Sequence, residues 1–324
     1  MTWNKARLLA TVLAIAFIAP AAAATWAVGP ARELKTVARA LELARDDDVI
    51  EVQPGTYRGD VAVIVQRRLT IRGVGARPVF TADGQHAEGK AIWVVRDGDI
   101  TIDNIEFRGA RVPDRNGAGI RFERGRLTLR RCSFFDNEMG LLTANFEDAR
   151  LTIEDSEFGQ APHHAGALHH LLYVGRIASF SLTGSRLHGG YVGHLVKSRA
   201  RESLIAHNTI VDGPLGSASY EIDLPNGGLA RVIDNTIGQS ADTENPVLVA
   251  YGAEGAAWPV SALTLEGNLL INDRTWGGTF LRVWRDRLPS NAEVLVRNNR
   301  LAGPGGLDAG AGARLEGNVH VPRP

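Results

Sequence analysis

The chain has 324 residues, of which 36 are basic and 36 are acidic, so its formal net charge is zero. This balance argues against a general nucleic-acid binder, which would carry a basic excess. Cys132 is the only cysteine, so the chain has no internal disulfide and no cysteine metal cluster. Hydrophobic residues make up 44% of the chain, which is enough for an extended core without cross-links.

The N-terminus has the pattern of a secretory signal peptide. Lys5 and Arg7 precede a short apolar run over residues 8–18, and three alanines at 22–24 offer a cleavage site. The apolar run is too short for a membrane anchor. We therefore expect residues 1–24 to be removed and residues 25–324 to form one secreted or periplasmic domain that is not bound to a membrane.

Residues 31–45, ARELKTVARALELAR, form a predicted amphipathic helix. Leu34, Val37, Leu41 and Ala44 lie on one stripe of that helix. In a solenoid, the open end of the first coil exposes strand edges and core, so it needs a cover. We expect residues 25–48, with this helix, to be the N-terminal cap.

A short phrase recurs along the rest of the chain, as in LTIEDSEF, SLIAHNTI and ARVIDNTI. It consists of an apolar strand, two residues, a small polar residue, a spacer and an apolar residue. Neighbouring copies of the small position are 19 to 33 residues apart, which excludes leucine-rich and propeller repeats with their fixed signatures. That position is held by Ile105, Cys132, Ser156, Ser185, Asn208, Asn235, Asn268, Asn299 and Asn318.

The five consecutive asparagines in this series indicate corners that stack on one another. Asn tolerates the left-handed backbone that a sharp corner needs. Asn side chains stacked at the strand spacing of about 4.8 Å can hydrogen-bond to each other. The pattern predicts an all-β fold, a single-stranded right-handed parallel β-helix in which each repeat is one coil.

The order of these segments resembles a known family. The helix, the segments DVIEVQPGTY and LTIRGVG, and the repeated LTI strands are similar to the pectin-lyase-like right-handed parallel β-helix repeat proteins, over nearly all of residues 25–324. The resemblance implies the fold. It leaves the function open, because this scaffold hosts lyases, hydrolases, epimerases and non-catalytic binding proteins.

Side-chain alternation along strands predicts which residues face outward. In GHLVKSRAR, the inward phase contains His194 and Val196, and the outward phase contains Leu195, Lys197 and Arg199. The opposite phase would bury Lys197 without a partner, at a cost of several kcal/mol. The cations are therefore expected on an outer face.

The same alternation places Tyr220 inside. Stacking of the coils then predicts a column of functional side chains on one outer sheet. Its members are Tyr173, Lys197 and Asp223, with His169, Arg199 and Glu221 as close neighbours. Seven of the nine histidines also lie between His163 and His207, so titratable side chains concentrate in these middle coils.

The segment HLVKSR resembles the lysine-bearing strand of the chondroitinase B and alginate lyase family. The resemblance implies that Lys197 is a general base, which removes the proton next to a uronate carboxylate. That family places an arginine on the following coil, where this sequence has YEID. Tyr173 or a histidine, with His169 as the candidate, would then supply the acid.

Further residues of this region are candidates for binding the substrate. Guanidinium groups bind carboxylates in a bidentate manner, which suits Arg199 and Arg201. Calcium remains a possible cofactor, because the side chains of Glu221, Asp223 and Asn226 offer the oxygen ligands that it prefers. The predicted catalytic residues are Lys197, Tyr173, His169 and Arg199. The predicted substrate-binding residues are Arg201, Glu221, Asp223, Asn226 and His194.

Two other functions stay open at this stage. Glu221 and Asp223 lie two residues apart on a strand, so their Cα atoms would be about 6.5–7 Å apart. This separation touches the window of about 6.5–9.5 Å that inverting glycosidases use. Alternatively, the outer sheet binds glycan without turnover, with Trp93, Tyr173 and Trp284 stacking on sugar rings. In each case the expected partner is a polysaccharide, and the protein is expected to be a monomer.

Overall fold

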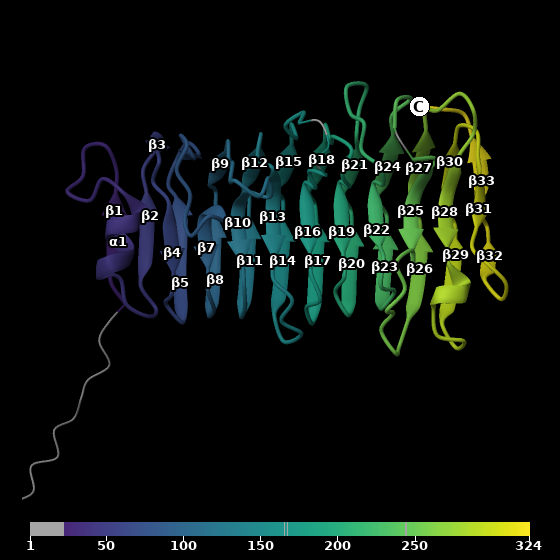
Figure 1. Cartoon of the computed structure of the whole chain (residues 1–324), viewed down its shortest axis with the longest axis horizontal. Helices are drawn as coiled ribbons and strands as arrows, with labels where there is room; N and C mark the ends of the chain where they lie inside the picture. Colours follow the sequence, from purple (N-terminus) through teal and green to yellow (C-terminus); the bar gives the residue numbers. More distant parts are fainter. Residues whose placement is uncertain (1–22, 165, 167, 244) are drawn as a thin grey trace, which may run out of the picture.

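The coils of this protein stack into one elongated solenoid. The computed structural model describes residues 23–164, 166, 168–243 and 245–324. Three parallel sheets of 12, 10 and 11 strands run along its length, and each coil adds one strand to each sheet in turn (Figure 1). The predicted right-handed parallel β-helix is confirmed.

The twelve-stranded sheet begins at the N-terminal end of the solenoid. In spatial order it contains β1 (Thr25–Val28), β2 (Val49–Val52), β5 (Arg68–Gly73), β8 (Asp99–Asp103), β11 (Arg126–Arg130), β14 (Arg150–Glu154), β17 (Ser179–Thr183), β20 (Glu202–Ala206), β23 (Leu229–Ile233), β26 (Ala262–Glu266), β29 (Glu293–Arg297) and β32 (Arg314–Glu316).

The ten-stranded sheet carries the candidate site. It contains β4 (Ala62–Ile64), β7 (Ala91–Val95), β10 (Ala118–Phe122), β13 (Met139–Thr143), β16 (Leu172–Val174), β19 (Val196–Ser198), β22 (Ile222–Leu224), β25 (Val247–Tyr251), β28 (Thr279–Val283) and β31 (Gly306–Asp308). A short 3-10 helix, η1 (Arg285–Arg287), follows β28.

The eleven-stranded sheet completes each coil. It contains β3 (Thr56–Arg58), β6 (Val79–Thr81), β9 (Glu106–Arg108), β12 (Ser133–Phe135), β15 (Glu157–Gly159), β18 (Arg186–His188), β21 (Thr209–Val211), β24 (Thr236–Gln239), β27 (Leu269–Asn272), β30 (Arg300–Ala302) and β33 (Val319–Val321).

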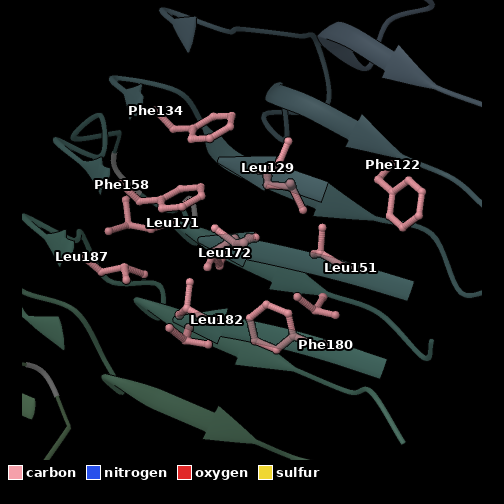
Figure 2. Packing of buried hydrophobic residues seen from close by; sticks show 14 of the residues in the cluster. Phe122, Leu129, Phe134, Leu151, Phe158, Leu171, Leu172, Phe180, Leu182 and Leu187 are labelled. Carbon is pink, nitrogen blue, oxygen red and sulfur yellow. The ribbon is translucent and has the colours of Figure 1, made fainter. Parts of the chain in front are cut away.

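The interior of the solenoid is a continuous apolar core. Along β11, Leu127 and Leu129 are buried, whereas the residues between and beside them point outward. Aromatic rings stack from coil to coil inside the eleven-stranded sheet, and the Phe134 and Phe158 ring centroids are 4.5 Å apart (Figure 2). Equivalent inward positions of successive coils thus pack directly on one another.

The asparagine ladder predicted from the sequence is present. Asn235 Oδ1 accepts hydrogen bonds from the Asn208 backbone N at 2.9 Å and from Asn208 Nδ2 at 3.0 Å. The same arrangement links each asparagine to the next as far as Asn318. One detail of the prediction is wrong, because the residue with left-handed backbone is not the asparagine itself but the residue before it. For example, φ is 59° at His207 and 53° at Asp234.

A helix covers the N-terminal end, as expected, but it is shorter than residues 31–45. Helix α1 spans Val37–Leu43 and begins after Thr36, whose side chain accepts a hydrogen bond from the Arg39 backbone N at 3.2 Å. The Asp60 carboxylate accepts hydrogen bonds from two further N–H groups of the first turn. These acceptors fix the start of the helix, because the first N–H groups of a helix have no intrahelical partner.

The predicted signal peptide lies outside the described residues, apart from 23 and 24, so it stays a prediction. In the described part of the chain, no helix is both long and apolar enough to cross a membrane. Cys132 lies in the ladder position and is fully buried, and burial raises the pKa of its thiol to about 12.

Candidate functional site

The predicted outer column is confirmed on the ten-stranded sheet. Tyr173 of β16 pairs in register with Lys197 of β19, and Lys197 pairs with Asp223 of β22. These three strands are neighbours in the middle of the solenoid (Figure 1). Their outward side chains therefore lie next to one another, one coil apart.

Lys197 faces outward but is not open to solvent, since only 7% of its surface is exposed. Its Nζ lies 3.2 Å from Asp223 Oδ2 and 2.6 Å from Glu254 Oε1. Asp223, on the neighbouring strand β22, is almost fully buried, with 2% of its side chain exposed. A buried ammonium needs such partners, because an unpaired charge at this depth would be strongly destabilising.

Arg199 connects the column to its surroundings through three separate hydrogen bonds. Nε donates to the Tyr173 hydroxyl at 2.9 Å, Nη1 to Asn226 Oδ1 at 2.8 Å, and Nη2 to Glu254 Oε2 at 2.5 Å. Burial lowers the pKa of Arg199, but the bonds to Glu254 and Tyr173 outweigh it and raise the pKa above its ordinary value. The guanidinium is charged and held in one orientation.

Glu254 is a site residue that the sequence analysis missed. It lies in the turn after β25 and is 57 residues away from Lys197 in the chain. Burial raises its pKa, but hydrogen bonds from Lys197 and Arg199 outweigh burial and hold the pKa below its ordinary value. No motif marks this residue, because its role depends on how the turn folds back over β22.

Tyr173, Lys197, Arg199, Asp223, Asn226 and Glu254 form one contacting cluster. Among the histidines expected near it, His170 rather than His169 contacts this cluster. The His170 ring centroid lies 5.3 Å from that of Tyr173 and 4.7 Å from that of His194. His169 instead contacts His164 through Nε2 and Nδ1, 3.3 Å apart. Burial, followed by the charge of His194 and those of the nearby cations, holds the pKa of His170 well below its ordinary value.

The predicted alternation of inward and outward side chains is wrong just before β19. His194 was expected inside and Leu195 outside, yet Leu195 is fully buried in the core. His194 Nδ1 lies 3.2 Å from Asp223 Oδ2 on the outer side, and the Tyr220 ring, also expected inside, lies 4.9 Å from the His194 ring. Two successive residues, Leu195 and Val196, both point inward because the chain turns a corner before the strand.

The outward orientation predicted for Glu221 is wrong for the same reason. Glu221 takes the position that Leu195 and Leu248 hold in the coils on either side, and it is fully buried. Within the described structure, neither carboxylate oxygen has a hydrogen-bond partner. Burial, followed by the charge of Asp212, raises the pKa of Glu221 well above its ordinary value. Glu221 and Asp223 therefore do not form a pair of catalytic carboxylates on one face.

The remaining predicted residues divide between the cluster and its margin. Asn226 belongs to the cluster through Arg199, whereas exposed Arg201 lies at the next corner, 6.0 Å from the ring centroid of Trp258. Trp93 was expected to face outward, but it is buried in the core. Trp284 is half-buried and stacks under Arg282, away from the column.

A groove of about 730 Å³ runs beside the column over β10, β13 and β16. Tyr173 and His170 line one part of it, Arg121 another, and Phe146 lies at its edge with 43% of its surface exposed. Burial lowers the pKa of Arg121, whose Nε lies 3.8 Å from Glu123 and, in the described residues, has no hydrogen-bond partner. The groove thus combines an aromatic wall with an incompletely paired guanidinium.

The possible calcium ligands do not converge. Glu221 lies in the interior, Asp223 contacts Lys197, and the Asn226 side chain bonds Arg199 and the Gly255 carbonyl. Across the part of the chain that the structure describes, no three His, Cys, Asp or Glu side chains are grouped as metal ligands.

Comparison with known proteins shows similarity in structure only. No protein-family profile matches the sequence, and the comparison with curated proteins found no match. The PL6 family alginate lyase AlyGC has a TM-score of 0.54 and 14% sequence identity, covering 93% of this chain. This chain spans 40% of that lyase. The resemblance to pectin-lyase-like right-handed β-helix proteins is therefore confirmed for the fold.

Two further solved structures match this chain with lower TM-scores. Pectin methylesterase PemA from Erwinia chrysanthemi has a TM-score of 0.39 and 13% identity, and the match covers 88% of this chain and 80% of the esterase chain. A double mutant of the periplasmic alginate epimerase AlgG has a TM-score of 0.42 and 10% identity, covering 86% of this chain and 78% of its own.

Proposed function

We propose that this protein binds a uronate-containing polysaccharide along the outer face of the ten-stranded sheet and cleaves it by β-elimination. The observation that carries the proposal is the cluster of Tyr173, Lys197 and Arg199, in which Tyr173 also lines the groove. An amine, a phenol and a fixed guanidinium are together there, and these groups can act as a base, an acid and a stabiliser of negative charge. The fold similarity to an alginate lyase supports the proposal.

The reaction needs one base and one acid. In its neutral amine form, after it has released its own proton to water, Lys197 Nζ takes the proton from the carbon next to the uronate carboxylate, and the electron pair forms the new carbon–carbon double bond. The bond to the glycosidic oxygen breaks, and the Tyr173 hydroxyl donates a proton to the leaving oxygen. Arg199, which donates a hydrogen bond to Tyr173, stabilises the phenolate that remains.

The groove would hold the rest of the polymer. Phe146 offers an exposed ring on which a sugar can stack. Arg121 can bind the carboxylate of a sugar further along, since a guanidinium matches a carboxylate in a bidentate manner. The column from Arg121 through Leu142 and Tyr173 to Lys197 crosses three strand spacings, so the contacted stretch is about 14 Å long.

Binding without cleavage is the second candidate. It is favoured by the two carboxylates that hold Lys197, because a paired ammonium cannot accept a proton. Under this proposal, the same groove and cations recognise the polymer and no product forms. Export and the monomeric state remain part of both proposals, as the sequence predicts them.

Incubation with a panel of uronate polymers tests the two proposals. Cleavage would appear as ultraviolet absorbance of the unsaturated product, and Lys197→Met would abolish it, while Lys35→Met at an exposed site would not. Calorimetric binding to a polymer without product formation would establish the second candidate instead. The absence of both binding and product across the panel would overturn both.

A further inference from the structure

We propose that Lys197 and Arg199 form a carboxylate-binding site, and that the side chain of Glu254 occupies it in the free protein. A uronate carboxylate of the ligand would take the place of Glu254. This inference rests on the proposed function for its ligand. It does not depend on whether cleavage follows binding.

The structure contains a carboxylate bound in this site. Glu254 Oε1 lies 2.6 Å from Lys197 Nζ, and Oε2 accepts a hydrogen bond from Arg199 Nη2 at 2.5 Å. One carboxylate therefore bridges both cations, with one oxygen on each. A sugar carboxylate has the same shape and charge, and it can make the same two contacts.

The two cations are held in place independently of Glu254. Asp223 contacts Lys197 from the neighbouring strand, and Tyr173 and Asn226 accept hydrogen bonds from the other two nitrogens of Arg199. Removing Glu254 would leave two cations with the single carboxylate of Asp223. The site would then carry one uncompensated positive charge, which one uronate carboxylate neutralises.

Glu254 is also the partner that can leave. Its side chain is 42% exposed, whereas that of Asp223 is 2% exposed. Water can solvate the partly exposed Glu254 carboxylate when it leaves, and Lys197 then keeps Asp223 as its partner while Arg199 keeps Tyr173 and Asn226. Of the two carboxylates, Glu254 is therefore the one that can rotate into solvent, whereas Asp223 cannot.

The movement involves the side chain and not the turn. The Glu254 backbone N donates to the Pro225 carbonyl at 3.1 Å, Asn226 Nδ2 donates to the Gly255 carbonyl at 2.7 Å, and the Trp258 backbone N donates to the Asn226 carbonyl at 3.0 Å. These bonds hold the main chain on both sides of Glu254. The site is thus closed by one side chain on a fixed turn.

Calorimetry with a uronate tetrasaccharide tests the exchange. We expect Glu254→Gln to bind it about fivefold more tightly than the wild type, because the internal competitor has lost its charge. The carboxyl-reduced, neutral tetrasaccharide should show no gain. Asp286→Asn makes the same change in net charge at an exposed position of η1 and should bind as the wild type does. Equal affinity of the wild type and Glu254→Gln for the charged sugar would overturn the inference.

Acetate separates this inference from the proposed function. In Glu254→Ala, acetate should raise the Tm by about 2 °C over sodium chloride at the same ionic strength, by filling the vacant site. It should not do so in the wild type or in Glu254→Ala/Arg199→Gln. If acetate acts in this way but no variant binds uronate, the carboxylate site stands and the proposed function fails. If the wild type binds uronate and neither acetate nor Glu254→Gln has an effect, the proposed function stands and the inference fails.

Discussion

Arg199 Nε donates a hydrogen bond of 2.9 Å to the Tyr173 hydroxyl of the preceding coil, so the phenol and the guanidinium act as a unit. If Tyr173 is the acid of the proposed elimination, Tyr173→Phe should lower kcat by about 10²- to 10⁴-fold, with little change in the affinity for the polymer. Initial rates of product absorbance measure this. Tyr220→Phe is the matched control, because Tyr220 packs on His194 and should keep near wild-type rates. A Tyr173→Phe enzyme of undiminished kcat would show that another group donates the proton.

Arg121 should contribute to binding through charge. Arg121→Gln is expected to weaken binding of a uronate oligosaccharide about tenfold, because a hydrogen-bonded charge pair in the groove is lost. Binding of the neutral, carboxyl-reduced sugar should not change. Arg300→Gln, on the eleven-stranded sheet, serves as the control in the same calorimetric titration. Equal losses for the charged and the neutral sugar would mean that Arg121 shapes the groove without binding a carboxylate.

The asparagine ladder should be a large contributor to stability. Asn235→Ala removes the acceptor of the Asn208 backbone N and one of the two acceptors of Asn208 Nδ2, which keeps only the Leu182 carbonyl. We expect a loss of about 3 kcal/mol in the free energy of unfolding, measured by urea denaturation. Asn291→Ala, at an exposed loop position, should change it by less than about 0.5 kcal/mol. Similar values for the two variants would contradict the role assigned to the ladder.

Glu221 should make the protein less stable as pH rises. Its pKa in the folded state is raised, so the folded state retains a proton that the unfolded state loses. Stability then falls by about 1.4 kcal/mol per pH unit between the unfolded pKa of about 4.3 and the raised folded pKa. Glu221→Leu should remove this slope and stabilise the protein by about 1–3 kcal/mol at neutral pH.

Urea denaturation at several pH values measures the effect of Glu221. Glu293→Gln is the control, because Glu293 is exposed at the start of β29, and its pH profile should match the wild type. A Glu221→Leu protein that keeps the wild-type slope would place the responsible group elsewhere.

The sequence predicted those features that depend on local repetition. The asparagines recur in a fixed relation to their strands, so their stacking could be read directly. The pairing of Tyr173, Lys197 and Asp223 also followed, because each lies in the middle of a strand where alternation holds. Extended backbone turns each side chain to the face opposite the one before it.

The sequence misled at the corners that lead into the ten-stranded sheet. Leu195 and Val196 are both buried, as are Glu221 and Ile222, so alternation breaks at the same place in two successive coils. At a corner the chain changes direction, so the alternation of inward and outward side chains along the strand does not continue through it. For this reason Glu221 was assigned to the wrong face.

Glu254 could not be found from local pattern. It contacts residues 55 and 57 positions earlier, and its contacts depend on the length and path of one turn. A lone glutamate in a glycine-containing turn is indistinguishable from a solvated surface residue until the coils are placed on one another.

The register of the ten-stranded sheet has a consequence for how such a surface can change. Tyr173, Lys197 and Asp223 occupy three consecutive rungs, and the rungs are about 4.8 Å apart. Along the axis of the solenoid, side chains of this column are therefore separated by whole multiples of the strand spacing. A substitution changes the chemical group at one position of the column. The gain or loss of a complete coil between Arg121 and Lys197 would instead change the distance between these two side chains by one strand spacing.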